Sequence, residues 1–384
     1  MAVVARVTGA GMDFIDLKTQ YRRLREPINK RIQAVLDHGQ FVLGVEVEEL
    51  EQRLASFVGA NHCISVSSGT DALLIALMAL DIGPGDEVIT TPFTFIATAE
   101  AIALLGAKPV FVDIDRRTYN IDPELFEPAV TERTRAMMAV SLFGQCADFD
   151  RINRIGARHG VTVIEDAAQS FGAKYGERFS CALSSLAAAS FYPSKPLGCY
   201  GEGGAVFSDD DKLALAAREL RVHGQDRGYH HVRVGINGRM HTLQAAILLA
   251  KLDVFEDELK ARQRVAQRYG ALIEEYFADC APERVVSPPY VEPHNRSVFA
   301  QYTVEVPNRS AVREFMTSRD VPTAVHYPMP LHRQPAYAAG GADRRFPVAE
   351  DVAQRVISLP MHPYLKEGDQ VRVVAALRDA VLRA

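Results

Sequence analysis

Short apolar runs alternate with longer amphipathic segments through the first two thirds of the chain. The short runs are rich in Val, Ile and Ala and are bounded by turn residues, which is typical of buried strands. Because helical patterns separate these runs, we predict an α/β fold whose mostly parallel central sheet is covered by helices on both faces. The predicted strands are 62–66, 87–91, 109–113, 136–141, 161–165 and 205–208, and the predicted helices between the earlier ones are 70–80, 95–105 and 149–159.

Two further segments flank this region and divide the chain. Residues 21–37 have helical spacing and predict an N-terminal arm, and residues 243–270 predict one long helix. Prolines become frequent after it, and a smaller segment follows with its own strand at 302–306. We therefore predict the arm and a large domain over residues 1–255 and a small C-terminal α+β domain over 256–384. The charged run at 46–51 predicts a solvated helix face.

The composition limits the classes of protein that fit. With 384 residues, 48% apolar and 24% charged, the chain is expected to be a soluble globular protein of about two domains. Its 43 basic and 48 acidic residues are interspersed, which argues against a nucleic-acid partner. The five cysteines lie far apart without a CxxC pair, so we expect reduced thiols, a cytoplasmic location and no metal site. No apolar run reaches the roughly 18 to 20 residues of a membrane-spanning helix, and we expect no membrane partner.

Asp166 is the first candidate for chemistry, because it follows the buried run at 161–165. It is therefore expected at the carboxyl edge of the sheet, where open α/β folds bind ligands. A carboxylate there could keep a pyridinium nitrogen protonated, and a protonated ring is the electron sink that carbanion chemistry on an amino acid requires. Taken alone, Asp166 is explained more simply as a helix N-cap.

Lys195 is the second candidate, since it follows an Ala-rich strand and precedes a glycine-dense turn at 198–204. A partly buried lysine loses its proton more readily and then forms an imine with an aldehyde. Taken alone, Lys195 is explained more simply as a solvated lysine in a hairpin.

The stretch SSGTDAL at 67–73 is the third candidate. A strand gives way here to a helix through small polar residues, so backbone N–H groups and the positive end of the helix dipole converge, as in phosphate sites. An ordinary capped helix explains the same stretch equally well.

Six motifs stand in order along most of the chain, and together they identify a family. They are SSGTDAL, DEVITTPFTFIATAEAI, KPVFVDID, VIEDAAQSFGA, SFYPSKPLGCYGEGG and GINGRMHTLQAAI. In combination they closely resemble the sugar aminotransferases of the DegT/DnrJ/EryC1/StrS group, which have the type I aminotransferase fold and depend on pyridoxal 5'-phosphate. The resemblance implies a transaminase that uses this cofactor.

The resemblance also implies a role for each matching position. Lys195 is similar to the Schiff-base lysine, and Asp166 to the partner of the pyridine nitrogen. Members with His at the lysine position perform dehydration instead, so Lys195 favours transamination, in which the lysine also moves the proton. The other cofactor contacts are Phe95 stacking on the ring, Gln169 against the ring or its hydroxyl, and the phosphate ligands Gly69, Thr70, Ser190 and Asn237.

Asn237 is similar to the asparagine that reaches the phosphate from a neighbouring subunit, which implies a homodimer with a shared active site. An alternative from another class is a non-catalytic regulatory or binding protein on the same fold. Because Lys195, Asp166 and Gln169 are all present, the sequence favours an enzyme.

Three strings point to a narrower subgroup: FIDLKTQ, SLFGQCADFD and HGQDRGYHHVRVG. They resemble enzymes that aminate carbon 3 of a UDP-linked 3-keto-N-acetylglucosaminuronic acid with L-glutamate as the donor, for surface polysaccharides such as lipopolysaccharide. Arg239, His326 and Tyr327 match the residues that contact the sugar carboxylate in that subgroup, and a guanidinium suits a carboxylate. A 3- or 4-keto deoxysugar nucleotide is the alternative substrate, because similar strings occur in relatives that act on neutral sugars.

Overall fold

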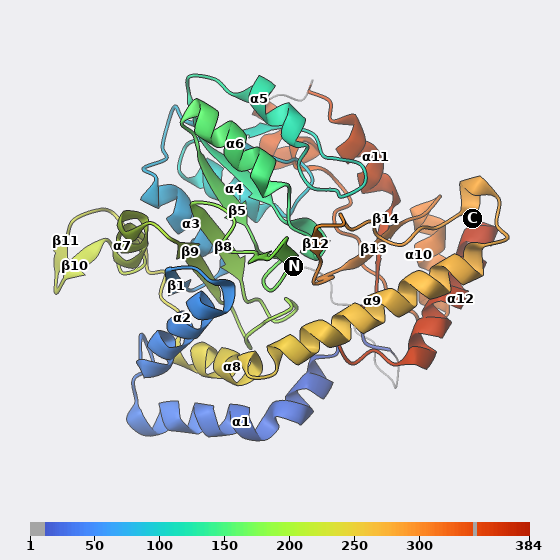
Figure 1. Cartoon of the computed structure of the whole chain (residues 1–384), viewed down its shortest axis with the longest axis horizontal. Helices are drawn as coiled ribbons and strands as arrows, with labels where there is room; N and C mark the ends of the chain where they lie inside the picture. Colours follow the sequence, from blue (N-terminus) through green and yellow to red (C-terminus); the bar gives the residue numbers. More distant parts are fainter. Residues whose placement is uncertain (1–11, 341–343) are drawn as a thin grey trace.

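The computed structural model describes residues 12–340 and 344–384 and has a seven-stranded sheet at its centre (Figure 1). Six of its strands run in the same direction, and the strand at 204–208 runs antiparallel to both of its neighbours. The parallel core confirms the predicted α/β class. Across the sheet the order is β1 (His62–Val66), β9 (Gly204–Ser208), β8 (Leu186–Ser190), β5 (Thr162–Asp166), β4 (Thr134–Val140), β2 (Glu87–Thr90) and β3 (Lys108–Phe111).

Helices cover both faces of this sheet because alternate strand residues point to opposite sides. In β4, Met137 and Ala139 belong to one apolar core, and Ala136 and Met138 belong to the other. Helices α2 (Val45–Val58), α6 (Phe149–His159) and α8 (Thr242–Leu252) cover the first core, and α3 (Gly69–Ala79), α4 (Ala97–Leu104) and α7 (Asp211–Leu220) cover the second.

A smaller core lies towards the C-terminus, around the antiparallel pair β13 (Tyr302–Glu305) and β14 (Val356–Leu359). One helix connects the two cores, because Phe255 and Leu259 pack in the large core and Tyr269 and Ile273 in the small one. The domain boundary proposed between residues 255 and 256 lies at the start of this connecting helix. The helices that build the small core are α9 (Phe255–Phe277), α10 (Arg309–Ser318) and α12 (Glu367–Arg383).

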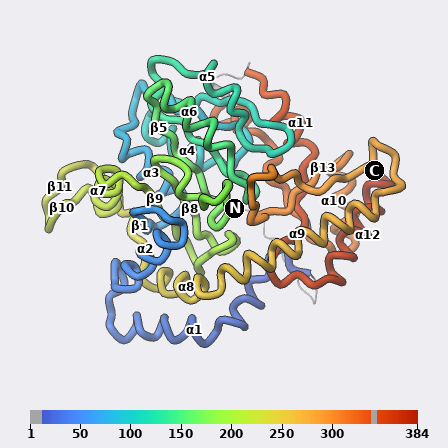
Figure 2. The backbone as a smooth tube through the Cα atoms, viewed as in Figure 1, coloured from blue at the N-terminus to red at the C-terminus, as the bar shows by residue number. Residues whose placement is uncertain are grey.

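Helix α1 (Leu17–His38) forms the predicted N-terminal arm and lies along α8, as the tube in Figure 2 shows. Leu24 and Ile28 pack there against Ile247 and Ala250. Among the described residues, none of the helices combines the length and apolar character that crossing a membrane requires. The remaining short elements are α5 (Phe126–Ala129), α11 (Pro347–Arg355), β6 (Lys174–Tyr175), β7 (Arg178–Phe179), β10 (Gln225–Arg227), β11 (His230–His231) and β12 (Asn295–Arg296).

The structure corrects two expectations. The single helix expected at 243–270 is two helices, since α8 ends at Leu252 and α9 begins at Phe255. The break lets α8 stay against the large core while α9 reaches the small one. The face expected at 46–51 is solvated only in part, because Glu48 is exposed whereas Glu46 and Glu51 are only 7% and 8% exposed.

Candidate active site

Asp166 is the last residue of β5 and lies at the carboxyl edge of the parallel strands, as the sequence predicts. Its buried carboxylate accepts a 2.7 Å hydrogen bond from Thr98 Oγ1 and a 3.1 Å bond from the amide of Ala168. Burial raises the pKa of Asp166 above its usual value, although these donors and the charge of Lys195 oppose the rise. A cation placed beside this carboxylate would therefore be stabilised.

Lys195 lies in the loop that follows β8, where its amide donates a 2.9 Å hydrogen bond to Tyr192 O. The side chain is partly buried and interacts electrostatically with Asp166. Burial lowers the pKa of Lys195 to about 8, and the Asp166 charge limits the fall. Because such a lysine exchanges its proton near neutral pH, it suits both nucleophilic attack and proton transfer.

The loop that carries Lys195 is fixed by contacts on several sides. A Cβ at Gly198 would lie 2.5 Å from Tyr192 O, so this position has no room for a side chain. The fully buried Lys251 of α8 donates a 2.5 Å hydrogen bond to Gly198 O, and its ammonium lies 4.1 Å from the ring centroid of Tyr200. These contacts restrict the positions that Lys195 can adopt.

The N-terminus of α3 is where the sequence predicts a phosphate site. Ser68 Oγ accepts a 3.0 Å hydrogen bond from Asp71 N and caps the helix. The preceding amides of the first turn, at Gly69 and Thr70, have no partner within the helix. A Cβ at Gly69 would lie 2.5 Å from Ser190 Cβ, so the end of β8 approaches this turn closely. Three of the predicted phosphate ligands are thus brought together.

Gln169 connects the Asp166 region to the C-terminal part of the chain. Its Oε1 accepts a 2.8 Å hydrogen bond from Phe143 N, and its Nε2 donates a 3.0 Å bond to Tyr327 OH. Burial raises the pKa of Tyr327, and the charge of Asp166 adds to this rise, so the phenol stays protonated. Tyr327 therefore lies beside Asp166, as a residue shared by the cofactor and substrate regions would.

His326 and Phe95 complete this group. His326 Nδ1 lies 3.0 Å from Ser358 Oγ in a hydrogen bond. Burial lowers the pKa of His326 to about 4, and the charge of Lys195 contributes, so the imidazole is neutral at neutral pH. The ring of Phe95 is 55% exposed, and its centroid lies 6.1 Å from that of Tyr327. An exposed aromatic face is thus available in front of α4.

Asn237 and Arg239 are positioned through their backbone. Arg239 pairs with Val66 in an antiparallel bridge, and Ser67 N donates a 2.9 Å hydrogen bond to Gly238 O. The side chain of Asn237 is exposed, and that of Arg239 is partly buried. None of the contacts found among the described residues joins either side chain to Lys195 or Asp166.

The sequence analysis did not single out three residues that support this site: Thr98 against Asp166, the Phe143 amide against Gln169, and Ser358 against His326. Only Thr98 carries a sequence signal, because it lies in the first turn of the helix that follows Phe95. Phe143 lies in the turn that follows β4, and Ser358 lies within β14, so both are distant in the chain from the residues they contact and only folding brings them here.

The chain is similar to known aminotransferases over most of its length. The model of the DegT/DnrJ/EryC1/StrS aminotransferase family matches residues 22–378. The UDP-2-acetamido-2-deoxy-3-oxo-D-glucuronate aminotransferase of Pseudomonas aeruginosa is 56% identical over 368 residues, which are 96% of this chain and 100% of that protein. A pleiotropic regulatory protein of Geobacillus stearothermophilus is 44% identical over 95% of this chain and 97% of its own length.

Solved structures show the same fold. A DegT DnrJ EryC1 StrS aminotransferase from Brucella abortus superposes with a TM-score of 0.90 at 42% identity, over 96% of this chain and 99% of that one. NtdA from Bacillus subtilis, solved with the bound cofactor PMP, has a TM-score of 0.87 at 29% identity, over 96% of this chain and 83% of that one.

Proposed function

The chain belongs to the DegT/DnrJ/EryC1/StrS aminotransferase family, and from this premise we propose that it moves the amino group of L-glutamate to carbon 3 of a UDP-linked 3-keto-N-acetylglucosaminuronic acid. The product would serve surface polysaccharide synthesis in the cytoplasm. One observation carries the proposal: Lys195, with its lowered pKa, lies within the electrostatic reach of both Asp166 and the proposed sugar-binding residue His326.

The residues at the site fit pyridoxal phosphate. Gly69 lets Ser190 approach the first turn of α3 more closely than a residue with a Cβ would, and the first amides of α3 suit the phosphate. Asp166 would face the ring nitrogen, and Lys195 would attach to the aldehyde. When bound, this cofactor supplies a protonated ring that withdraws the electrons released at the reacting carbon.

Lys195 would transfer the proton that transamination moves. A group whose pKa lies near the working pH serves both as base and as acid, and the pKa of Lys195 is lowered to about 8. The fixed loop around Gly198 would keep Nζ at one place through both halves of the reaction. Asp166 would hold negative charge beside the ring, with Thr98 Oγ1 fixing its orientation.

Arg239 would bind the sugar carboxylate, with help from His326 and Tyr327. His326 is neutral at neutral pH because burial lowers its pKa to about 4, so it would orient the substrate by hydrogen bonding rather than by charge. Tyr327 keeps its proton and would donate a hydrogen bond. The positive charge that the uronate needs would therefore come from Arg239.

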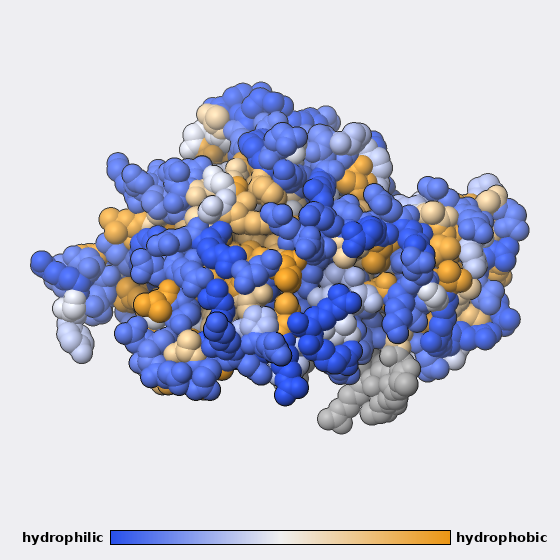
Figure 3. Space-filling model, turned by 60° about the horizontal axis from the view of Figure 1, so that its bottom comes forward, coloured by the Kyte–Doolittle hydropathy of each residue, from blue (hydrophilic) through white to orange (hydrophobic). Residues whose placement is uncertain are grey.

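We further infer that two copies form a homodimer in which Asn237 reaches the neighbouring site. The β10–β11 hairpin, just before Asn237, projects from the body of the subunit (Figure 1). Tyr229 and Val234 on this segment are 95% and 89% exposed, and Val45 at the start of α2 is 62% exposed. Orange patches also interrupt the hydrophilic face seen in Figure 3. Exposed apolar groups of this size favour burial against another protein surface.

Two other functions make different predictions. A 3- or 4-keto deoxysugar nucleotide has no carboxylate, so its use would leave Arg239 without a charged partner. A regulatory protein, as one relative is named, would have no need for a lysine and a buried carboxylate with shifted pKa values.

The test begins with the absorption spectrum of the purified protein, before and after addition of L-glutamate. We expect the band of protein-bound pyridoxal phosphate to give way to that of pyridoxamine phosphate. A response to another amino acid alone would refute the donor, and no response to any amino acid would refute the transaminase.

The substrate is tested with two UDP-linked 3-keto sugars that differ only in the carboxylate, the uronic acid and its 6-hydroxymethyl analogue. We expect kcat/KM to favour the uronate by orders of magnitude, because the analogue leaves charged and polar groups unpaired. The variant Arg239→Gln should remove most of this preference. Equal use of both sugars by the unaltered protein would exclude the uronate assignment.

A further inference from the structure

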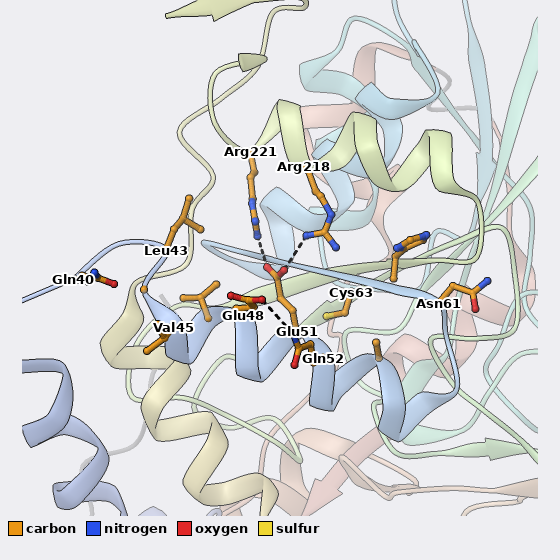
Figure 4. Close-up of a pocket in the computed structure, with 14 residues that line it drawn as sticks. Gln40, Leu43, Val45, Glu48, Glu51, Gln52, Asn61, Cys63, Arg218 and Arg221 are labelled. Carbon is orange, nitrogen blue, oxygen red and sulfur yellow. Dashed lines mark hydrogen bonds and ion pairs between the residues drawn. The ribbon is translucent and has the colours of Figure 1, made fainter. Parts of the chain in front are cut away.

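Glu51 lies at the centre of a buried ionic cluster between α2, β1 and α7, which we define as Glu51, Ser65, Arg218 and Arg221. Figure 4 shows Glu51 between the two arginines. Glu51 Oε1 accepts hydrogen bonds from the amide of Ser65 (2.9 Å), from Ser65 Oγ (2.8 Å) and from Arg221 Nη1. Arg218 Nη1 binds the other oxygen at 3.0 Å. Ser65 is fully buried, and Glu51 and Arg221 are each 8% exposed.

Arg221 differs from Arg218 because it also binds two backbone segments. Its Nη1 donates a 2.8 Å hydrogen bond to Ser65 O, next to the end of β1. Its own carbonyl accepts a 3.0 Å hydrogen bond from the amide of Gly238. Arg221 therefore contacts the end of β1 through its side chain and the segment around Gly238 through its backbone.

These two segments also pair directly with each other. Val66 and Arg239 form a bridge, and Ser67 N donates to Gly238 O at 2.9 Å. The chain continues from Ser67 into the first turn of α3, the proposed phosphate site. On the other segment, the proposed ligands Asn237 and Arg239 immediately flank Gly238.

We propose that Arg221 is a positioning residue that sets two groups of ligands together: the phosphate-binding turn of its own subunit and the Asn237–Arg239 segment that serves the partner's site. This inference rests on the proposed function, in which Asn237 reaches the neighbouring site, and it places Arg239, two residues further along the same segment, in that site too. Arg221 would then couple the two active sites, because its guanidinium holds Ser65 O near the end of β1 while its own carbonyl holds the amide of Gly238.

The chemistry of the side chain explains why arginine is suited to this position. A guanidinium has five donors in a planar array, so it can bind a carboxylate and a carbonyl at once. A lysine keeps the charge but has a single donor atom. Stability alone is a weak explanation, because a buried ion pair is often no more stabilising than apolar side chains of similar size.

The test compares Arg221→Lys with Arg218→Lys. Arg218 is the matched control, since it binds the same carboxylate from the last turn of α7, just before Arg221, contacts neither Ser65 nor Gly238 among the described residues, and is more exposed. We expect Arg221→Lys to raise both the Kd of pyridoxal phosphate and the KM of the keto sugar about 10- to 100-fold, as small misplacements of ligands do. Arg218→Lys should leave both nearly unchanged. Equal effects of the two variants, or an effect of Arg221→Lys on only one constant, would overturn the proposal.

Coupling across the dimer is tested in mixed dimers purified with two different tags. One subunit carries Lys195→Ala and Arg221→Lys, and the other is unaltered, so the only working lysine belongs to the unaltered subunit. We expect a higher KM for the sugar than in the control dimer that carries Lys195→Ala alone. An unchanged KM would refute the coupling.

If Arg221→Lys does not fold, the double variant Glu51→Gln with Arg221→Gln replaces it, because it leaves no unpaired buried charge. Hydrogen exchange followed by mass spectrometry then reports on the holoenzyme directly, and peptides at 65–70 and 236–240 should both lose protection. Protection retained in either peptide would contradict the proposal. Failure of the proposed function is distinct, because the unaltered protein would then bind no cofactor or show no response to amino acids.

Discussion

Two buried clusters of charge in this molecule have opposite electrostatic character. At Asp166 and Lys195, burial raises the pKa of the acid and lowers that of the lysine, so each charged form is disfavoured. At Glu51, burial would also raise the pKa, but Arg221 and Ser65 reverse this effect and the pKa is lowered. The first pair is thus ready to exchange protons, whereas Glu51 stays ionised at neutral pH. Shifted pKa values mark function only where the charged forms are left partly uncompensated.

Among the variants proposed here, removal of Lys195 should have the largest effect, and the property affected is turnover. We expect Lys195→Ala to lose turnover by about 10⁴-fold or more, since it removes both the attachment point and a proton transfer worth about 10²–10⁴-fold by itself. The variant should still bind pyridoxal phosphate noncovalently and release it on dialysis. Near-normal turnover in a steady-state assay would refute the assigned role, and Lys195→Arg controls for loss of charge.

Glu51→Gln should have the largest effect on folding. Because it leaves the Arg221 charge unpaired, we expect a loss of about 3–5 kcal/mol in the free energy of unfolding, measured by denaturant titration. The lowered pKa means that Glu51 stabilises the fold above its unfolded value of 4.5 and that this contribution disappears as the pH falls through the folded pKa. The difference in the free energy of unfolding between Glu51→Gln and the unaltered protein should therefore become smaller as the pH falls. If this difference in unfolding free energy stays constant below pH 4.5, Glu51 is not ionised in the folded protein.

Asp166→Asn should lower activity and at the same time raise stability. We expect kcat to fall by about 10²–10³-fold, as when one preorganised electrostatic group is removed. Because the raised pKa of Asp166 means that its ionised form costs stability above its usual pKa, the neutral amide should raise the melting temperature at neutral pH. If the melting temperature falls instead, as we expect for Glu51→Gln, the ionised form of Asp166 stabilises the fold as that of Glu51 does, and the two clusters do not differ in this respect.

Lys251→Met should have the smallest effect, and it tests whether the buried Lys251 supports the loop that carries Lys195. It removes the hydrogen bond to Gly198 O at nearly constant volume, so we expect about 1–3 kcal/mol of destabilisation from the unpaired carbonyl. Cofactor binding should persist, while kcat falls modestly because the Lys195 loop loosens. A fully active variant would show that the other contacts of the loop suffice.

The strands and the chemical residues were accessible from sequence because each has a local signal. Alternating apolar runs predict the parallel strands, and Asp166 follows one of them directly. The motif around Lys195 identifies a family, and with it the cofactor. The division of the helix at Leu252 has no such signal, because neither a proline nor a glycine lies between α8 and α9.

The sequence by itself determined the fold class, the family and the residues whose types suit transamination. Only the tertiary structure revealed that Glu46 and Glu51 are buried, that Gln169 contacts Tyr327, and that Arg221 joins two segments far apart in the chain. The physical reason is that periodicity and motifs record what each residue does within its own element. The burial and pKa of a residue depend instead on which distant groups surround it in the folded protein. A charged residue in a helix gives the same sequence pattern whether it faces water or an arginine.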